Sequence, residues 1–206
     1  MAPSEALPRT RRYQWRVVDI VVAAVIAVAG GVIFWAWSLG AAPIGVLTAP
    51  YPPIAGLYGG GWVIPAVLGA LIIRKPAAAF FCEMVAATGE LIMGSQYGVT
   101  VLISGIVQGL GAEVVFAFFG YRRFTLPVAL LAGGGAGLMM GLNDSFAPWG
   151  WNIAYTLDHK LVYIAACVIG CAVIAGGLSW LATRALARTG ALSSFPSRSA
   201  DSEPVL

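Results

Sequence analysis

The sequence has little charge and few of the residues that build metal or disulfide sites. Only 10% of its 206 residues are charged, whereas a soluble domain carries about 25%, and 59% are hydrophobic. Its three cysteines, Cys82, Cys167 and Cys171, lie inside apolar stretches, so a disulfide framework is not indicated. The single histidine, His159, has no second ligand at metal-binding spacing. The composition predicts a membrane protein without a metal or a cofactor.

Short motifs that mark common enzymes are also missing. No G-x-x-x-x-G-K-[ST] phosphate loop occurs, so the chain does not use ATP through that fold. It has neither a G-x-S-x-G elbow nor an H-E-x-x-H pair, which argues against a membrane hydrolase. The basic residues stand beside apolar runs and form no patch of the kind that binds nucleic acid. We therefore expect neither an enzyme nor a nucleic-acid partner.

Long apolar runs make up most of the chain. Six of them are separated by charges and turn residues, and each approaches the ~20 residues of a membrane-spanning helix. The expected spans are Val17 to Trp37, Leu57 to Ile73, Ala77 to Met93, Val99 to Tyr121, Phe124 to Leu142, and Leu161 to Thr183. The polar ends, 1–13 and 191–206, are expected to be disordered and cytoplasmic. The predicted fold is an all-α integral membrane protein, with one transmembrane domain of six helices over 14–190.

The distribution of Lys and Arg predicts the orientation of these spans, because cytoplasmic loops retain positive charge. With the amino terminus inside, eleven of the twelve basic residues fall on the cytoplasmic side. Only Lys160 lies outside. Five or seven spans would break this alternation. We expect six spans in the plasma membrane, with both termini in the cytoplasm.

Three glutamates lie inside the expected spans, where an ionised group costs a few kcal/mol and needs a partner or a function. Glu83 and Glu90 are seven residues apart, which places them on one helical face about 10 Å apart along the axis. Glu90 lies near the outer surface, where it can accept hydrogen bonds from a ligand or simply reach water. Glu83 can equally make an interhelical hydrogen bond, and Glu113 can serve helix packing.

Two outer loops carry groups that suit a flat ligand. The loop 143–160 mixes amide, carboxylate and aromatic side chains, and Tyr97 and Tyr51 lie in neighbouring loops. Together they can form a stacking site for a planar or cationic molecule, or the aromatic belt of a membrane interface. The uncharged, proline-rich loop 39–56 can fold back as a lid. The candidate binding residues are Tyr51, Glu83, Glu90, Tyr97, Asn143, Asp144, Trp149, Trp151, Asn152 and His159.

Small residues form a stripe along the first expected span. Ala23, Ala27 and Gly31 recur every four residues, so they share one helical face and permit close approach of another helix. The neighbour can be a helix of the same bundle or of a partner protein.

The stretch Trp15-Arg16-Val17-Val18-Asp19-Ile20 through Trp35-Ala36-Trp37, with the six apolar segments, resembles the S components of energy-coupling factor vitamin transporters. It is most similar to the YkoE-type proteins associated with thiamine and its hydroxymethylpyrimidine precursor. The likeness covers Trp15 to Arg188. It implies six helices, an outer small-molecule site covered by the first loop, and a first-helix motif, Ala23-x-x-x-Ala27, that docks on a transmembrane coupling subunit. Two cytoplasmic ATPase subunits would supply the energy.

The resemblance also implies how a ligand is held. A glutamate pairs with an aminopyrimidine, and aromatic rings stack on it or on a thiazolium. Glu90 and Trp149 or Trp151 match these roles, with Asn152 and His159 as hydrogen-bonding candidates. The expected function is high-affinity capture of thiamine or hydroxymethylpyrimidine for an ATP-driven importer. The alternatives are an S component for another vitamin and a proton-coupled secondary transporter, with the three glutamates as a relay.

Overall fold

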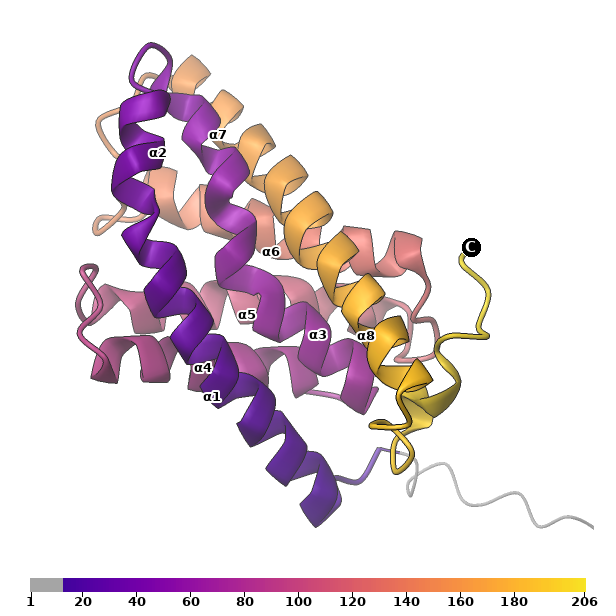
Figure 1. The fold of residues 1–206 in the computed structure, drawn as a ribbon. Coiled ribbons are helices and arrows are strands. Elements are labelled where there is room, and N and C mark those ends of the chain that lie inside the picture. Colours follow the sequence, from indigo (N-terminus) through magenta and orange to yellow (C-terminus); the bar gives the residue numbers. More distant parts are fainter. Residues whose placement is uncertain (1–12) are drawn as a thin grey trace, which may run out of the picture.

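The computed structural model describes residues 13–206, and within them every regular element is a helix (Figure 1). Five segments are long and apolar enough to cross a membrane: Val17–Leu47, Pro52–Ile73, Thr100–Phe118, Leu126–Phe146 and Leu157–Arg188. The sixth helix, α4, has only 15 residues, Ala78–Ile92, and packs between α1 and α5. The predicted all-α membrane fold with six helices is confirmed. The expected disorder of 1–13 concerns residues that, apart from Tyr13, lie outside the described part.

Several spans consist of more than one helical element. The first joins α1 (Val17–Leu39) to α2 (Ala41–Leu47), and the second joins the 3-10 helix η2 (Pro52–Val63) to α3 (Ile64–Ile73). The helices α5 (Thr100–Phe118) and α6 (Leu126–Phe146) are single elements. The last span runs through α7 (Leu157–Cys171), the π-helix η3 (Ala172–Gly177) and α8 (Leu178–Arg188). The expected loop 39–56 is therefore largely helical.

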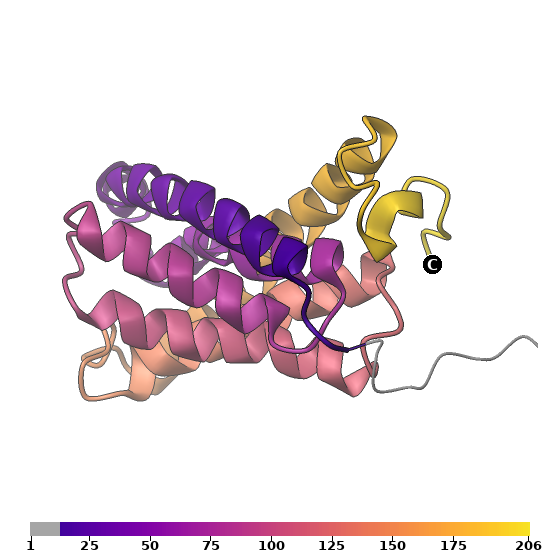
Figure 2. The same ribbon diagram turned by 90° about the horizontal axis from the view of Figure 1, so that it is seen from below.

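The second span lies at the centre of the bundle. Its most apolar window is 72% buried, compared with 33% for the first and the last spans. Glycines permit the close contacts: a Cβ on Gly61 would lie 2.1 Å from the ring of Trp37, and one on Gly170 would lie 2.2 Å from the carbonyl oxygen of Leu57. Around this span, α1 packs on α4, α4 on α5, α5 on α6 and α6 on α7. Figure 2 shows α1, α4 and α5 side by side.

The carboxyl-terminal tail differs from the expected disorder of 191–206. It folds across the end of the bundle where α1 begins and includes the short 3-10 helix η4 (Pro196–Ser199) (Figure 1). Leu192 and Phe195 are buried in a cluster with residues of α1, α3 and α4. The hydroxyl of Ser197 donates a hydrogen bond to the carbonyl oxygen of Ile72 at 2.8 Å. A few apolar side chains thus hold a tail whose overall composition is polar.

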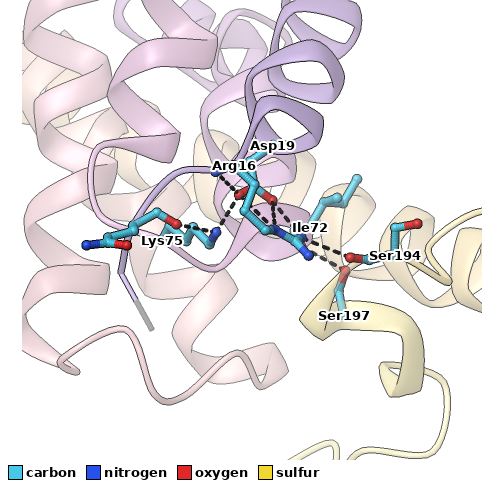
Figure 3. Close-up of polar contacts among 7 residues, drawn as sticks. Arg16, Asp19, Ile72, Lys75, Ser194 and Ser197 are labelled. Atoms are coloured by element: carbon cyan, nitrogen blue, oxygen red, sulfur yellow. Dashed lines mark hydrogen bonds and ion pairs between the residues drawn. The ribbon is translucent and has the colours of Figure 1, made fainter. Parts of the chain in front are cut away.

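A group of three charges lies beside this tail, and of these Asp19 and Lys75 are buried and Arg16 is half-exposed (Figure 3). The carboxylate of Asp19 is fully buried and pairs with both Arg16 and Lys75. The Nη2 atom of Arg16 is 2.8 Å from Asp19 and also donates to the carbonyl oxygen of Ser194 at 2.9 Å. Lys75 donates to the carbonyl oxygen of Gln14 at 2.6 Å. The charges therefore link the start of α1, the α3–α4 turn and the tail.

A second ion pair holds the far end of the tail. Glu203 accepts two hydrogen bonds from the guanidinium of Arg74, at 2.6 and 2.7 Å. Burial by itself would raise the pKa of Glu203, but these hydrogen bonds and the positive charge of Arg74 hold that pKa below its ordinary value. The backbone N–H of Leu126 donates to the carbonyl oxygen of Val205 at 3.1 Å, at the start of α6. The tail thus connects the ends of α1, α3 and α6.

Candidate functional site

A cavity of about 290 Å³ opens at the end of the bundle opposite the tail, where α1, α4 and α6 end. Residues of α2, η2, α5 and α7 complete its wall. Its polar lining residues are Glu90, Ser104, Gln108, Asp144 and Asn152. Its main aromatic lining residues are Tyr58, Trp62, Tyr97, Trp151, Tyr155 and Tyr163. This mixture of rings with a few polar groups is typical of a small-molecule site.

Glu90 lies in the last turn of α4, with its side chain fully buried. Its Oε1 atom accepts hydrogen bonds from the hydroxyls of Ser38 at 2.7 Å and Ser95 at 2.9 Å. The Ser38 oxygen in turn accepts a hydrogen bond from the indole N–H of Trp62 at 3.0 Å. The Oε2 atom is buried and has no partner within the described chain. Because an unsatisfied buried oxygen costs free energy, this atom can accept a further hydrogen bond, as can the Oε1 atom of Glu83, which is unpartnered in the same way but lies outside the cavity wall.

Asp144 supplies the second carboxylate from the end of α6, and it is 7% exposed. Its Oδ2 atom accepts a hydrogen bond from the Tyr163 hydroxyl at 2.8 Å, and its Oδ1 atom accepts one from the Asn143 amide at 3.1 Å. The loop after α6 folds back on it, since the backbone N–H of Asn152 donates to the Asp144 carbonyl at 2.8 Å. Both oxygens of this carboxylate are therefore held by uncharged donors.

Aromatic rings form a continuous row along one side of the cavity. Trp37 and Tyr58 stack with centroids 4.4 Å apart, and Tyr58 meets Trp62 edge-on at 5.6 Å. Tyr97 continues the row, 6.0 Å from Trp62 and 5.3 Å from Trp151. Such edge-on and stacked pairs stabilise one another and fix the ring faces. The row connects the centre of the bundle with the loop between α6 and α7.

The charges at this site are all of one sign. Glu90 and Asp144 line the cavity, and no Lys, Arg or His is among its lining residues within the described chain. Burial, reinforced by the negative charges of Glu90 and Asp144, raises the pKa of Tyr97 in the α4–α5 connection. The Tyr97 hydroxyl thus keeps its proton at neutral pH.

Some of the residues predicted to bind a ligand meet here. The structure brings together Glu90, Tyr97, Asp144, Trp151 and Asn152 in the cavity wall. The loop 39–56 also contributes to the wall, mainly through small residues of α2 and η2. The role of these residues in binding stays a prediction.

Other predicted binding residues lie outside the wall. Trp149 is 47% exposed and donates its indole N–H to the Asn143 side chain at 3.0 Å. The ring of His159 lies 5.3 Å from that of Tyr51 and 6.0 Å from that of Tyr155. Only Tyr155 of this group lines the cavity. The lining residues of the cavity therefore do not include Trp149, Asn143, His159 or Tyr51.

Glu83 and Glu113 have structural partners at the starts of helices. The Oε2 atom of Glu83 accepts a hydrogen bond from the backbone N–H of Ala66, near the start of α3, at 3.1 Å. Glu113 accepts backbone hydrogen bonds from Ala77 at 2.6 Å and Ala79 at 2.9 Å, at the start of α4. Helix starts leave free N–H groups and carry partial positive charge, which favours a carboxylate. Of the three glutamates, only Glu90 lines the cavity.

The stripe of small residues on α1 faces α4 of the same chain. Ala23 and Ala27 are fully buried, and the thiol of Cys82 lies 3.8 Å from the carbonyl oxygen of Ala23. A Cβ on Gly31 would lie 3.1 Å from the backbone of Ala86 and of Gly89. While α1 stays packed on α4, this stripe is not accessible to a partner.

Several wall residues were missed from the sequence. Trp62 and Tyr58 lie in a glycine-rich stretch of the second span, and Tyr163 lies in the last span. Ser38 is hidden in an apolar run, yet it orients Glu90. Gln108 on α5 also belongs to the wall. Aromatic and hydroxyl groups within spans are common, so only the arrangement in space separates these from packing residues.

Comparison with known proteins gives three matches, all to membrane transport proteins. Residues 18–139 match the family described as an ABC-type cobalt transport system, permease component. The HMP/thiamine permease protein YkoE of Bacillus subtilis strain 168 is 35% identical over 180 residues, covering 86% of this chain and 87% of that protein. A crystal structure of an S component of an energy-coupling factor transporter superposes with a TM-score of 0.80 at 34% identity, covering 89% and 91% of the two chains.

These relatives are transport proteins and not enzymes. Identity above 30% over most of both chains, a shared fold and the all-α bundle with its apolar spans agree with one another. The chain belongs to the S components of energy-coupling factor transporters, in the YkoE-type group.

Proposed function

We propose that this chain captures thiamine or its hydroxymethylpyrimidine precursor for an ATP-driven energy-coupling factor importer. The observation that supports this most strongly is Glu90, a buried carboxylate with one unpartnered oxygen at the wall of an aromatic cavity. The name of the Bacillus subtilis relative refers to the same compounds. The chain would bind its ligand without altering it.

The chemistry of an aminopyrimidine suits this wall. Its exocyclic amino group can donate a hydrogen bond to Oε2 of Glu90, while Oε1 stays fixed by Ser38 and Ser95. Its flat ring can pack against Trp62 or Tyr97, whose positions the aromatic row fixes. A neutral pyrimidine and a thiazolium cation can both use these contacts.

The charge distribution supports a definite orientation in the plasma membrane. The described arginines of the terminal segments and of the short turns lie at the tail end, among them Arg16, Arg74 and Arg184, which contact the tail. Because cytoplasmic segments retain positive charge, we place both termini in the cytoplasm. The cavity then faces the outside. The short helix α2 would cover it as a lid, since Ala41 and Ile44 belong to its wall.

Energy for import would come from other subunits. The sequence has no phosphate loop, so a transmembrane coupling subunit and two cytoplasmic ATPase subunits are the proposed partners. A proton relay has less support, because Glu83 and Glu113 are bonded to backbone N–H groups and, within residues 13–206, no hydrogen bond links the three glutamates. Uptake by vesicles that contain this chain alone, driven by a pH gradient, would support the relay instead.

The cobalt in the matching family's description is not the ligand that this cavity suits. Cobalt prefers nitrogen or sulfur donors, and no histidine or cysteine lines the cavity within the described chain. The described residues also contain no group of three or more His, Cys, Asp or Glu side chains placed to hold a metal ion. An organic ligand fits the donor set better.

Native mass spectrometry of the protein purified from cells supplied with thiamine and hydroxymethylpyrimidine tests the proposal. We expect one of these compounds bound to each chain. Glu90→Gln should reduce the bound fraction, whereas Glu203→Gln, at the opposite end, serves as the matched control and should retain it. A wild-type protein that carries neither compound, even when each is added in excess, would refute the proposal.

A further inference from the structure

We propose that the cavity selects its ligand by charge, favouring a cation over its neutral isostere and excluding a phosphate ester, with Asp144 as the residue that sets this preference. The inference rests on the proposed function, and it narrows the ligand to a thiamine-like cation. It comes from the charges around the cavity and from the partners of its two carboxylates.

The first observation is that neither carboxylate of the cavity has a cationic partner within the described chain. Glu90 is bonded to two serine hydroxyls, and Asp144 to the Tyr163 hydroxyl and the Asn143 amide. All four donors are neutral. Within the described chain, neither carboxylate therefore has an ion-pair partner.

Two basic side chains near the start of α7 are engaged elsewhere. The ring of His159 contacts the Thr156 hydroxyl at 2.6 Å and Asp158 at 3.4 Å. The ammonium of Lys160 lies 4.9 Å from the centre of the Phe146 ring. Neither His159 nor Lys160 is a lining residue. A positive charge that balances this cavity therefore has to come with the ligand.

The absence of a cationic partner matters because both carboxylates are buried. Glu90 is fully buried and Asp144 is 7% exposed, so water screens their charges poorly. A cation in the cavity would be attracted by both carboxylates, whereas a phosphate would be repelled by both and would find no Lys or Arg at the wall. The rings of Tyr97 and Trp151 add faces that attract a cation.

The two carboxylates differ in the role that they can take. Glu90 has a free oxygen, so it can accept a hydrogen bond from an amino group. Both oxygens of Asp144 are already occupied by Tyr163 and Asn143, so it acts mainly through its charge. Asparagine at position 144 would remove the charge and keep one acceptor, for the Tyr163 hydroxyl, but its NH2 group would replace the oxygen that now accepts from the Asn143 amide. The substitution therefore removes the charge together with one hydrogen bond, and a variant that removes a hydrogen bond alone is needed beside it.

Calorimetric titration of the purified chain with three probes tests this inference. The probes are thiamine, its uncharged isostere with a thiophene in place of the thiazolium, and thiamine monophosphate. For the wild type we expect thiamine to bind at least about ten-fold more tightly than either other probe, the size of one buried cation–aromatic contact. In Asp144→Asn the ratio of thiamine to isostere affinity should fall by at least about three-fold but stay above one, because Glu90 and the rings of Tyr97 and Trp151 still attract the cation; the affinity for the isostere itself should change by less than about two-fold.

Tyr163→Phe is the matched variant, because it removes one hydrogen bond from Asp144 and keeps the charge. It should retain the thiamine-to-isostere ratio of the wild type. Equal wild-type affinities for thiamine and isostere, or tight binding of the monophosphate, would overturn the inference and leave the proposed function standing. If Asp144→Asn weakens the binding of all three probes equally, Asp144 has a structural role. That result would overturn the claim that Asp144 sets the charge preference. Failure of every probe to bind the wild type would refute the proposed function itself.

Discussion

Carboxylates at the two ends of this bundle have opposite surroundings. At the tail end, Asp19 pairs with Arg16 and Lys75, and Glu203 at the periphery pairs with Arg74. At the cavity end, Glu90 and Asp144 receive hydrogen bonds from neutral groups only. The bundle therefore combines charge-compensated acidic groups at one end with uncompensated ones at the other.

The carboxylates at the tail end have a structural role, whereas we propose that those at the cavity end bind a ligand. An ion pair that is completed within the chain fixes the start of α1, the α3–α4 turn and the tail relative to one another (Figure 3). A carboxylate without a cationic partner contributes less to the fold and stays available to a ligand. Substitutions at the two ends should therefore change different measured quantities.

The largest expected effect is on stability, from Asp19→Asn. The substitution leaves the buried ammonium of Lys75 without its carboxylate, and breaking a buried pair costs about 3–5 kcal/mol. We expect a marked fall in the unfolding temperature of the protein in detergent. Asp144→Asn is the contrast, since no cation loses its partner, and its unfolding temperature should stay near that of the wild type. Equal falls in the unfolding temperatures of the two variants would contradict the proposed difference between the two ends of the bundle.

A smaller effect is expected for the two tryptophans of the α6–α7 loop. Trp151 lines the cavity and contacts Tyr97, whereas Trp149 lies outside and bonds to Asn143. Loss of a stacking face should weaken thiamine binding by about ten-fold in Trp151→Ala, and by less than about two-fold in Trp149→Ala. Quenching of tryptophan fluorescence by thiamine measures both. The reverse order would show that the loop is arranged differently when the ligand is bound.

The smallest effect concerns pH at the tail end. Since the pKa of Glu203 in the folded protein lies below its ordinary value, its pairing with Arg74 stabilises the tail above pH ~4.3 and is lost as the pH falls below it. A partly exposed pair of this kind is worth about 1 kcal/mol or less. Protease protection of the tail should therefore decrease between pH 6 and pH 3. In Glu203→Gln, protease protection of the tail should depend less on pH. A decrease identical to that of the wild type would show that another group causes it.

The sequence was sufficient for the fold and the family. Apolar runs broken by charged turns predict six helices, and the stretch from Trp15 to Trp37 resembles the YkoE-type proteins; the comparisons confirm the family. The boundaries were less accurate, because Pro52 and the following residues form a 3-10 helix where a loop was expected.

The site was only partly predictable, because similar residues have different neighbours in space. Three glutamates in the spans look alike in sequence, but Glu83 and Glu113 contact the starts of other helices. Trp149 and Trp151 are two residues apart in a loop without regular periodicity, so nothing in the sequence shows which one faces the cavity. The tail was expected to be disordered from its polar composition, but Leu192, Phe195 and Ala200 are buried in a cluster with residues of α1 and α3.

The central claim is that Glu90, at the uncompensated end, holds the ligand. Calorimetric titration of thiamine into purified wild type and Glu90→Gln tests it most directly. The account predicts one site per chain in the wild type and an affinity lower by about 10- to 100-fold in the variant, the effect of losing a hydrogen bond to a charged group. Equal affinity in the two proteins, both folded, would contradict it.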